Sequence, residues 1–219
     1  NIKNYVLINT TFGQANHFFG EKKLIVKYET NNFLKSRKEK LIFYKFREFK
    51  KKRFILFNDT ILNLVKINPD IKFVIRPHPS EDIEKYKFLK IFPNVLVTKK
   101  YNVVPWILKS KLVISDYCST SIEAKMLGVP SLNYKVPVKI NFLDKTFYED
   151  SIKVKNFSKL NKIINKKKSK KLNKISNLKK RLINTDNKFS SSKKLFYHVI
   201  NSYNLNQKKI NIKDRLTHI

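Results

Sequence analysis

The segment from residue 111 to 133, KLVISDYCSTSIEAKMLGVPSLN, constrains the fold of this chain more than any other stretch. A short apolar run ends at Ser115 and Asp116, small hydroxyl side chains follow, and a helix-like segment ends at Gly128 before a second apolar run. This order predicts a strand, a tight turn, a helix and the next strand. Ser or Thr beside a helix start caps free backbone N–H groups, and these groups with the helix dipole can bind an anion. The stretch therefore predicts an α/β unit with an anion site at its turn.

A second polar cluster lies upstream in the same relation to a strand. The residues Arg76 to Glu81, RPHPSE, directly follow the apolar run at 73–75. In open α/β sheets, polar residues at the carboxyl ends of neighbouring strands form the ligand crevice. We therefore expect both clusters to face one phosphate-bearing ligand.

The other apolar segments extend this pattern along the chain. Strands are expected at 5–8, 72–75 and 95–97, a helix that continues or restarts near Arg53 and runs to Ile67, and short helices at 81–89 and 101–110, with 14–32 irregular. Short apolar strands that alternate with helices are typical of a buried parallel sheet. The prediction is an α/β protein with a Rossmann-like, doubly wound parallel sheet over residues 1–150.

The last third of the chain has a different composition. Residues 151–219 hold 20 Lys and Arg but only two acidic residues, Asp186 and Asp214. Spaced apolar residues in this region predict amphipathic helices. We expect a basic helical C-terminal segment that packs on the first domain; the alternative is a basic helix that lies on an anionic membrane surface.

The whole chain is strongly basic, with a formal net charge of +32. The excess is mostly Lys among many Asn and Ile residues, as AT-rich coding produces, and no nucleic-acid-binding motif accompanies it. We therefore expect a solvated basic surface that attracts anionic lipids or nucleotide phosphates, and no nucleic-acid partner. Peripheral contact with an anionic membrane remains open.

The cysteine content and the length of the apolar runs indicate the cellular compartment. The single cysteine, Cys118, excludes an internal disulfide and favours a reducing compartment. No apolar run reaches the roughly 20 residues that span a bilayer. We expect a cytoplasmic protein, at the inner face of the plasma membrane if the basic surface binds lipid. Because the chain opens at Asn1 and enters a predicted strand almost at once, we also expect it to be part of a longer protein.

Three strand ends supply the candidate ligand-binding residues. His78 lies between two prolines that fix its backbone, so its ring is oriented to donate to a phosphate or to act as acid or base. Arg76 offers a planar fork for phosphate, and Glu123 either complements a helix dipole or contacts ribose hydroxyls. The loop after the first strand faces the crevice or is a plain turn. The candidates are Thr10, Thr11, Gly13, Arg76, His78, Pro79, Ser119, Thr120, Ser121 and Glu123.

Several common chemistries have no motif here. The sequence contains no Gly-x-Ser-x-Gly nucleophile elbow, no Gly-rich dinucleotide fingerprint and no phosphate-binding loop with Gly-Lys-Ser/Thr. The four His and one Cys are too dispersed for a zinc site. We expect no metal and no cofactor besides a nucleotide-linked donor, and the catalytic residues are unknown at this point.

The polar clusters at residues 76–81 and 115–130 together resemble paired motifs of a known protein family. RPHPSE, followed about forty residues later by SDYCSTSIEA and LGVP, resembles the donor-binding half of GT-B glycosyltransferases. The closer resemblance is to bacterial surface-carbohydrate biosynthesis proteins, whose second domain opens with a strand and an Asn-Thr-x-Phe-Gly-x-x-Asn loop, here residues 9–16. The His-Pro and Ser/Thr pairs are also similar to those of GT-B sialyltransferases and Kdo transferases, which use CMP-activated acidic sugars. The resemblance covers about residues 4–135.

The resemblance implies a function and roles for particular residues. It implies that His78, Ser119 and Thr120 hold the donor nucleotide and its phosphate, with Glu123 near the ribose. The acceptor side and the general base would lie in a preceding domain. The expected function is the donor-binding domain of a metal-independent glycosyltransferase that makes capsule, lipopolysaccharide O-antigen or a related surface polysaccharide. Its partners would be a CMP-activated sugar and a glycan or glycolipid acceptor.

Other functions stay open at this point. A CDP-glycerol glycerophosphotransferase of the teichoic-acid type resembles the chain in the same segments, although Cys118 stands where a Ser is common. A UDP-sugar epimerase shares the sheet and the loop before the helix. A noncatalytic basic module that docks on membrane or nucleic acid is the alternative from another class.

Overall fold

The computed structural model describes residues 2–31, 33–138 and 152–166. The chain divides into two compact units, residues 1–174 and 175–219. All described residues belong to the first unit, so the fold below is that of this unit.

A six-stranded parallel sheet forms the centre of the unit, with strand order β3-β2-β1-β4-β5-β6. The strands are β1 (Tyr5–Asn9), β2 (Phe73–Arg76), β3 (Val95–Val97), β4 (Ser110–Ser115), β5 (Ser131–Tyr134) and β6 (Ile152–Val154). The chain builds outward from β1 to β3, then returns to the other side of β1 with β4 and continues to β6. This order confirms the predicted α/β class and the doubly wound parallel sheet, and it puts the topological switch point between β1 and β4.

The strands are apolar on both faces because helices cover both. All five residues of β1 are buried. Val6 and Ile8 of β1 belong to one hydrophobic core, whereas Tyr5 and Leu7 belong to the other. The alternation follows from the two-residue period of a strand, which sends successive side chains to opposite faces.

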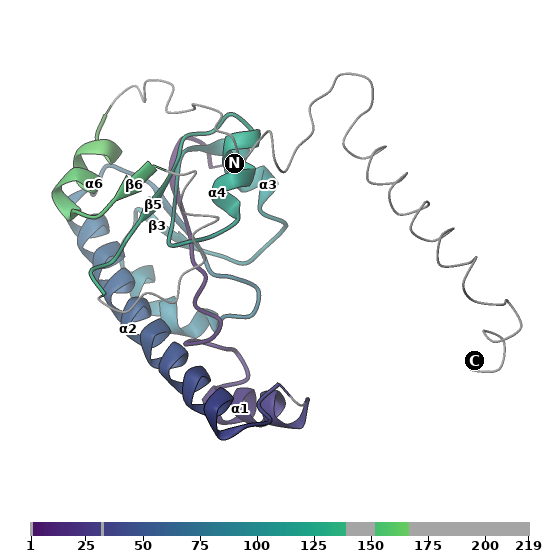
Figure 1. Cartoon of the computed structure of the whole chain (residues 1–219). Helices are drawn as coiled ribbons and strands as arrows, with labels where there is room; N and C mark the ends of the chain where they lie inside the picture. Colours follow the sequence, from purple (N-terminus) through teal and green to yellow (C-terminus); the bar gives the residue numbers. More distant parts are fainter. Residues whose placement is uncertain (1, 32, 139–151, 167–219) are drawn as a thin grey trace, which may run out of the picture. The chain divides into compact units, whose positions relative to one another are not determined.

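Helices on the two faces close these two cores. One core includes residues of α2 (Arg37–Ile67), the 3-10 helix η1 (Ile83–Ile91) and α6 (Phe157–Ile164). The other includes residues of α3 (Val104–Lys109) and the segment from α4 (Thr120–Met126) to β5. Figure 1 shows the long α2 on one side of the sheet and α3 and α4 on the other.

The first connection contains more helix than the sequence pattern predicted. Residues 21–30, expected to be irregular, form α1 (Glu21–Thr30), and α2 begins at Arg37, so this helix continues through Arg53 and does not restart there. A capping box starts α2: Glu39 N donates to the Ser36 side chain, and the Glu39 carboxylate accepts from the Ser36 N–H. The amino-terminal part of α2 contacts α1, away from the sheet (Figure 1).

The sheet continues past residue 150, the boundary expected from the sequence. β6 pairs with β5, and Leu160 and Ile164 of α6 are buried in the same core as α2. Asn161 and Asn165 of α6 also hydrogen-bond to Asn68, directly after α2. The basic helices expected over the remainder of the C-terminal segment lie outside the described residues.

Candidate functional site

A polar cavity of about 470 Å³ lies at the carboxyl end of the sheet. Its walls come from the loops after β1, β2 and β4 and from α1. The lining residues are Thr11, Gly13, Gln14, His17, Leu24, Tyr28, His78, Ser80, Tyr117, Cys118 and Ser119. The strands β1 and β4 flank the switch point, where open α/β sheets bind their ligands.

Glu81 joins the loop after β1 to the loop after β2. Its fully buried carboxylate accepts hydrogen bonds from Thr10 Oγ1 at 2.9 Å, from Phe12 N at 2.9 Å and from His78 N at 3.2 Å. The Tyr86 hydroxyl donates to it as well, and burial together with the Glu81 charge raises the pKa of Tyr86. A carboxylate with several donors can stay buried without a cation beside it. Glu81 therefore fixes the backbone on which His78 sits.

The His78 ring is oriented by its neighbour Ser80. Nδ1 accepts from the Ser80 backbone N–H at 3.2 Å and lies 2.8 Å from Ser80 Oγ. Because Nδ1 accepts the amide hydrogen bond, the proton of the neutral ring is on Nε2. His78 is exposed at the cavity, so Nε2 is available as a donor to an anionic ligand.

Gly13 allows these two loops to approach each other closely. A Cβ added at Gly13 would lie 2.2 Å from Ser80 Oγ and 3.4 Å from Ser80 Cβ. The hydroxyl would have to move, whereas the rest of Ser80 would remain in ordinary contact. Glycine at this position thus leaves room for the Ser80 hydroxyl beside His78.

The loop after β4 turns sharply before Ser119. Tyr117 has a left-handed backbone with φ of 54°, which is rare for a bulky residue. Its N–H donates to Asn133 Oδ1 at 3.2 Å, and the Arg53 guanidinium stacks on its ring at 4.6 Å. These contacts hold the turn that brings Cys118 and Ser119 to the cavity wall.

The start of α4 is less suited to bind an anion than the sequence suggested. α4 has only seven residues, and the Ser119 side chain makes no capping hydrogen bond. The Ser119 hydroxyl is therefore on the cavity wall rather than in a cap. Cys118 is buried, and burial raises the pKa of its thiol.

A buried ion pair lies beneath this turn. Arg53 of α2 bonds to Asp116, and both side chains are almost fully buried. Burial raises the pKa of Asp116 to about 6, although the Arg53 charge acts in the opposite direction. Asp116 Oδ2 and Arg53 Nη1 have no hydrogen-bond partner among the described residues. The pair ties α2 to the end of β4.

Four of the ten residues predicted from the sequence line the cavity: Thr11, Gly13, His78 and Ser119. The two strongest candidates, His78 and Ser119, come from loops about forty residues apart and meet at this one cavity.

The other six lie beside the cavity or away from it. Thr10 is buried against Glu81, and Ser121 donates to Cys118 O at 2.9 Å. Thr120 Oγ1 contacts Cys118 Sγ at 3.0 Å, and the Pro79 carbonyl accepts from Lys99 at 3.0 Å.

Arg76 and Glu123 interact electrostatically with each other. The Arg76 guanidinium donates to Tyr101 O, and the Glu123 charge raises its pKa while burial lowers it more. Neither side chain lines the cavity.

Several lining residues were not among the predicted set. Gln14, Leu24 and Tyr28 come from the region expected to be irregular, and Gln14 Nε2 donates to the Tyr28 hydroxyl at 2.5 Å. His17 stacks on Phe18 at 4.7 Å, and burial with Lys27 and Lys99 lowers its pKa. The sequence offered no clear signal for this wall, because α1 buries only Leu24 and therefore lacks an apolar stripe.

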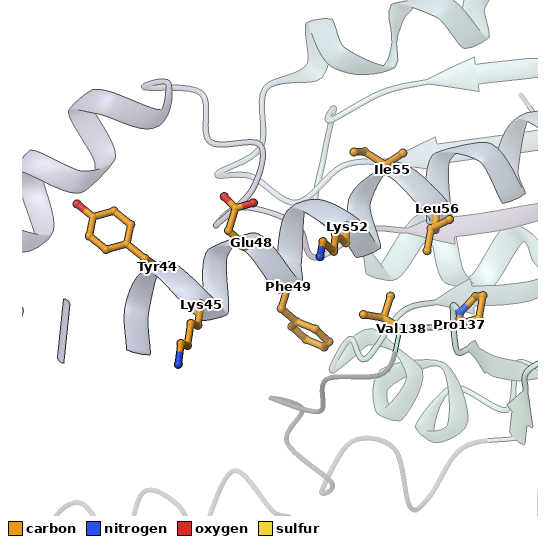
Figure 2. A pocket seen from close by; sticks show the side chains of 9 residues that line it. All are labelled: Tyr44, Lys45, Glu48, Phe49, Lys52, Ile55, Leu56, Pro137 and Val138. Atoms are coloured by element: carbon orange, nitrogen blue, oxygen red, sulfur yellow. The ribbon is translucent and has the colours of Figure 1, made fainter. Parts of the chain in front are cut away.

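A larger groove of about 790 Å³ runs along α2 (Figure 2). Its lining is mainly apolar and includes Phe49, Ile55 and Leu56 of α2 with Pro137 and Val138. Tyr44, Lys45, Glu48 and Lys52 complete it. The groove adjoins the end of a described range and lacks convergent polar groups, so the smaller polar cavity is the candidate site.

Two features are absent from the described ranges, a metal-binding cluster and a membrane-spanning helix. No group of three or more His, Cys, Asp or Glu side chains in them could hold a metal ion. None of the helices described here is both long and apolar enough to cross a bilayer.

Fold and site together define an α/β domain with a polar cavity at the switch point of a doubly wound parallel sheet. No protein-family model and no curated protein matches the sequence. Among solved structures, the chain is similar to the crystal structure of Methanocaldococcus jannaschii UDP-GlcNAc 2-epimerase in complex with UDP-GlcNAc and UDP. The identity is 16% and the TM-score 0.44, over 76% of this chain and 40% of that one. The chain thus spans less than half of that enzyme's length.

Proposed function

We propose that this chain is the donor-nucleotide-binding domain of a metal-independent glycosyltransferase that makes bacterial surface polysaccharide, with a CMP-activated sugar as donor. The observation that carries the proposal is the meeting of His78 and Ser119, with Thr11 and Gly13, at one cavity on the switch point. Ligands of open α/β sheets bind at this place.

The size and chemistry of the cavity support a nucleotide. Its volume of about 470 Å³ is within the roughly 300–1,000 Å³ of small-molecule sites. Hydroxyls, an amide and the Nε2 donor of His78 can bond to phosphate and ribose oxygens. Donors fixed in this way stabilise the charge that develops on a departing phosphate, which replaces the role of a metal ion.

We further propose that the acceptor and the general base belong to a part of the enzyme outside this chain. The described cavity holds one exposed imidazole and no carboxylate on its wall, so it is better suited to holding a donor than to activating an acceptor hydroxyl. On this proposal the chain binds the donor nucleotide but does not catalyse sugar transfer by itself.

Thermal melting with CMP, CDP, UDP and GDP tests the proposal. A ligand that binds only the folded state at 100 times its dissociation constant adds about 2.7 kcal/mol of stability. We expect CMP to raise the melting temperature, and His78→Ala and Ser119→Ala to abolish that shift. Ser110→Ala is a matched control, because Ser110 begins the strand that leads to Ser119 and its hydroxyl bonds to Ile107 O.

Other outcomes would assign a different function. A shift with CDP alone would indicate glycerophosphate transfer, and a shift with UDP alone would indicate a UDP-sugar enzyme such as an epimerase. Binding to random DNA or anionic vesicles without any nucleotide shift would overturn the proposal in favour of a noncatalytic basic module.

A further inference from the structure

The residues that line the cavity include no Lys, Arg, Asp or Glu. A nucleotide phosphate brings at least one negative charge, so a cation near the cavity would strengthen its binding. Five basic side chains contact a lining residue or interact with one electrostatically: Lys27, Arg47, Lys50, Arg53 and Lys99.

Three of these five form hydrogen bonds or ion pairs with other groups, and a fourth, Lys27, is exposed to solvent. Arg53 is paired with Asp116, and Arg47 donates to Gln14 O at 3.1 Å and pairs with Glu21. Lys99 donates to the carbonyls of Pro79 and Glu81. Lys27 is exposed and lies over the Phe19 ring at 5.3 Å.

Lys50 occupies the position on α2 between Arg47 and Arg53. Those two arginines, three residues away on either side, contact Gln14 and Asp116, and Gln14 and the residues after Asp116 line the cavity. Residues three apart on a helix are neighbours on its surface. Lys50 therefore lies on the helix face between the arginine that contacts the loop after β1 and the arginine that contacts the loop after β4.

The surroundings of the Lys50 ammonium agree with this position. Burial and the Arg53 charge lower its pKa, whereas Asp116, Glu81 and Cys118 raise it, and all three belong to the carboxyl end of the sheet. Nζ lies over the Phe46 ring, 5.6 Å from its centroid. Among the described residues it forms no ion pair of 4.0 Å or less with a carboxylate. A half-buried ammonium that forms no ion pair with a carboxylate is suited to bind a phosphate of a ligand.

We propose that Lys50 binds the phosphate of the nucleotide in this cavity and so supplies the charge that distinguishes a nucleotide from its nucleoside. The inference rests on the proposed function, since it takes the ligand to be a nucleotide. It adds a binding residue on α2, outside the three strand-end loops.

The test compares a nucleotide with its nucleoside on the full chain. Dissociation constants for CMP and cytidine are measured by calorimetry for the wild type, Lys50→Met, Lys50→Arg and the control Lys52→Met. Lys52 is exposed on the same helix and lines the separate groove. Lys50→Met should weaken CMP about tenfold or more, the size of a charge-assisted hydrogen bond, and leave cytidine unchanged. Lys50→Arg should retain most of the affinity for CMP, and Lys52→Met should match the wild type.

The outcomes separate this inference from the proposed function. If His78→Ala weakens CMP and Lys50→Met does not, the proposed function stands and the role of Lys50 is overturned. Equal weakening of CMP and cytidine by Lys50→Met would also overturn it, because that pattern indicates a packing defect rather than a lost charge. If no nucleotide binds the wild type, both the proposed function and the role of Lys50 are overturned. If Lys50→Met has a lower melting temperature than the wild type without ligand, Lys50→Gln is used in its place. If CDP or UDP, and not CMP, raises the melting temperature of the wild type, that nucleotide is compared with its own nucleoside.

Discussion

At the scale of single residues, Gly13 controls the orientation of His78 through Ser80. We expect Gly13→Ala to leave stability nearly unchanged, because the added methyl group displaces only the rotatable Ser80 hydroxyl. The displaced hydroxyl would leave His78 Nδ1, which it now contacts at 2.8 Å. Nucleotide affinity should therefore fall by roughly the value of one hydrogen bond, about 1 kcal/mol or fivefold.

A double-mutant cycle with Ser80→Ala supplies the control. In the Ser80→Ala background there is no hydroxyl for the new Cβ to meet, so Gly13→Ala should cause no further loss of affinity. Additive losses in the cycle would mean that Gly13 contributes in some way other than through Ser80.

These residues could be predicted from the sequence only where prolines or a cluster of hydroxyl residues marked the end of a strand. Proline on both sides of His78 and the hydroxyl cluster at Ser119 marked two strand ends, and the structure brings both to one cavity. Tyr28 carried no such mark. The helix on which it lies buries one residue, Leu24, so its sequence lacks the apolar stripe that predicts a helix. Ser80 and Glu81 were part of the noted cluster, but their roles depend on tertiary contacts with the loop after β1.

At the scale of elements, the Arg53–Asp116 pair ties α2 to β4, and its energy should depend on pH. The pKa of Asp116 is raised from 3.8 to about 6 in the folded state, so the folded state favours the protonated carboxyl. The contribution of the protonated Asp116 carboxyl to the stability of the folded state is present in full below about pH 4 and is lost as the pH rises through 6. Relative to Asp116→Asn, which does not titrate, the wild type should lose about 2 kcal/mol of unfolding free energy between pH 4 and pH 7.

Urea unfolding of both proteins across that range measures the difference. Other carboxylates titrate equally in the two proteins and cancel in the comparison. A wild type that gains stability over Asp116→Asn as the pH rises would show that the attraction of Arg53 exceeds the cost of burying the carboxylate.

The extent of α2 shows why element boundaries are harder to predict than elements. The segment 55–65 carries the apolar repeat that packs on the sheet, and it was predicted as helix. The amino-terminal part of α2 contacts α1 instead and leaves Leu41, Ile42 and Tyr44 exposed. Apolar periodicity follows burial, so it weakened where the helix leaves the core. The capping box at Ser36 was the local signal for the true start.

At the scale of the whole molecule, the sequence placed the end of the sheet domain near residue 150, whereas the structure continues it to α6. The change in composition after Glu149 suggested a boundary, because the following residues are strongly basic. Only a few apolar side chains in that stretch complete the core, among them Val154, Leu160 and Ile164. Their contribution depends on contacts with β5 and α2, which composition does not reveal.

We therefore expect a chain that ends at residue 150 to fail to fold cooperatively, whereas one that ends at residue 166 melts in a single transition. The shorter chain lacks Val154, Leu160 and Ile164, each 1% exposed or less. Full burial of such a side chain contributes about 1.5–3 kcal/mol, so the loss of about 5 kcal/mol or more is comparable to the whole stability of a typical domain. Circular dichroism melting curves of the two chains measure this. In the full chain, Leu160→Ala should cost about 2–5 kcal/mol, and the exposed neighbour Lys159→Ala should cost almost nothing. If the chain that ends at residue 150 melts as cooperatively as the longer one, the domain ends where the composition changes, and β6 and α6 are an appendage to it.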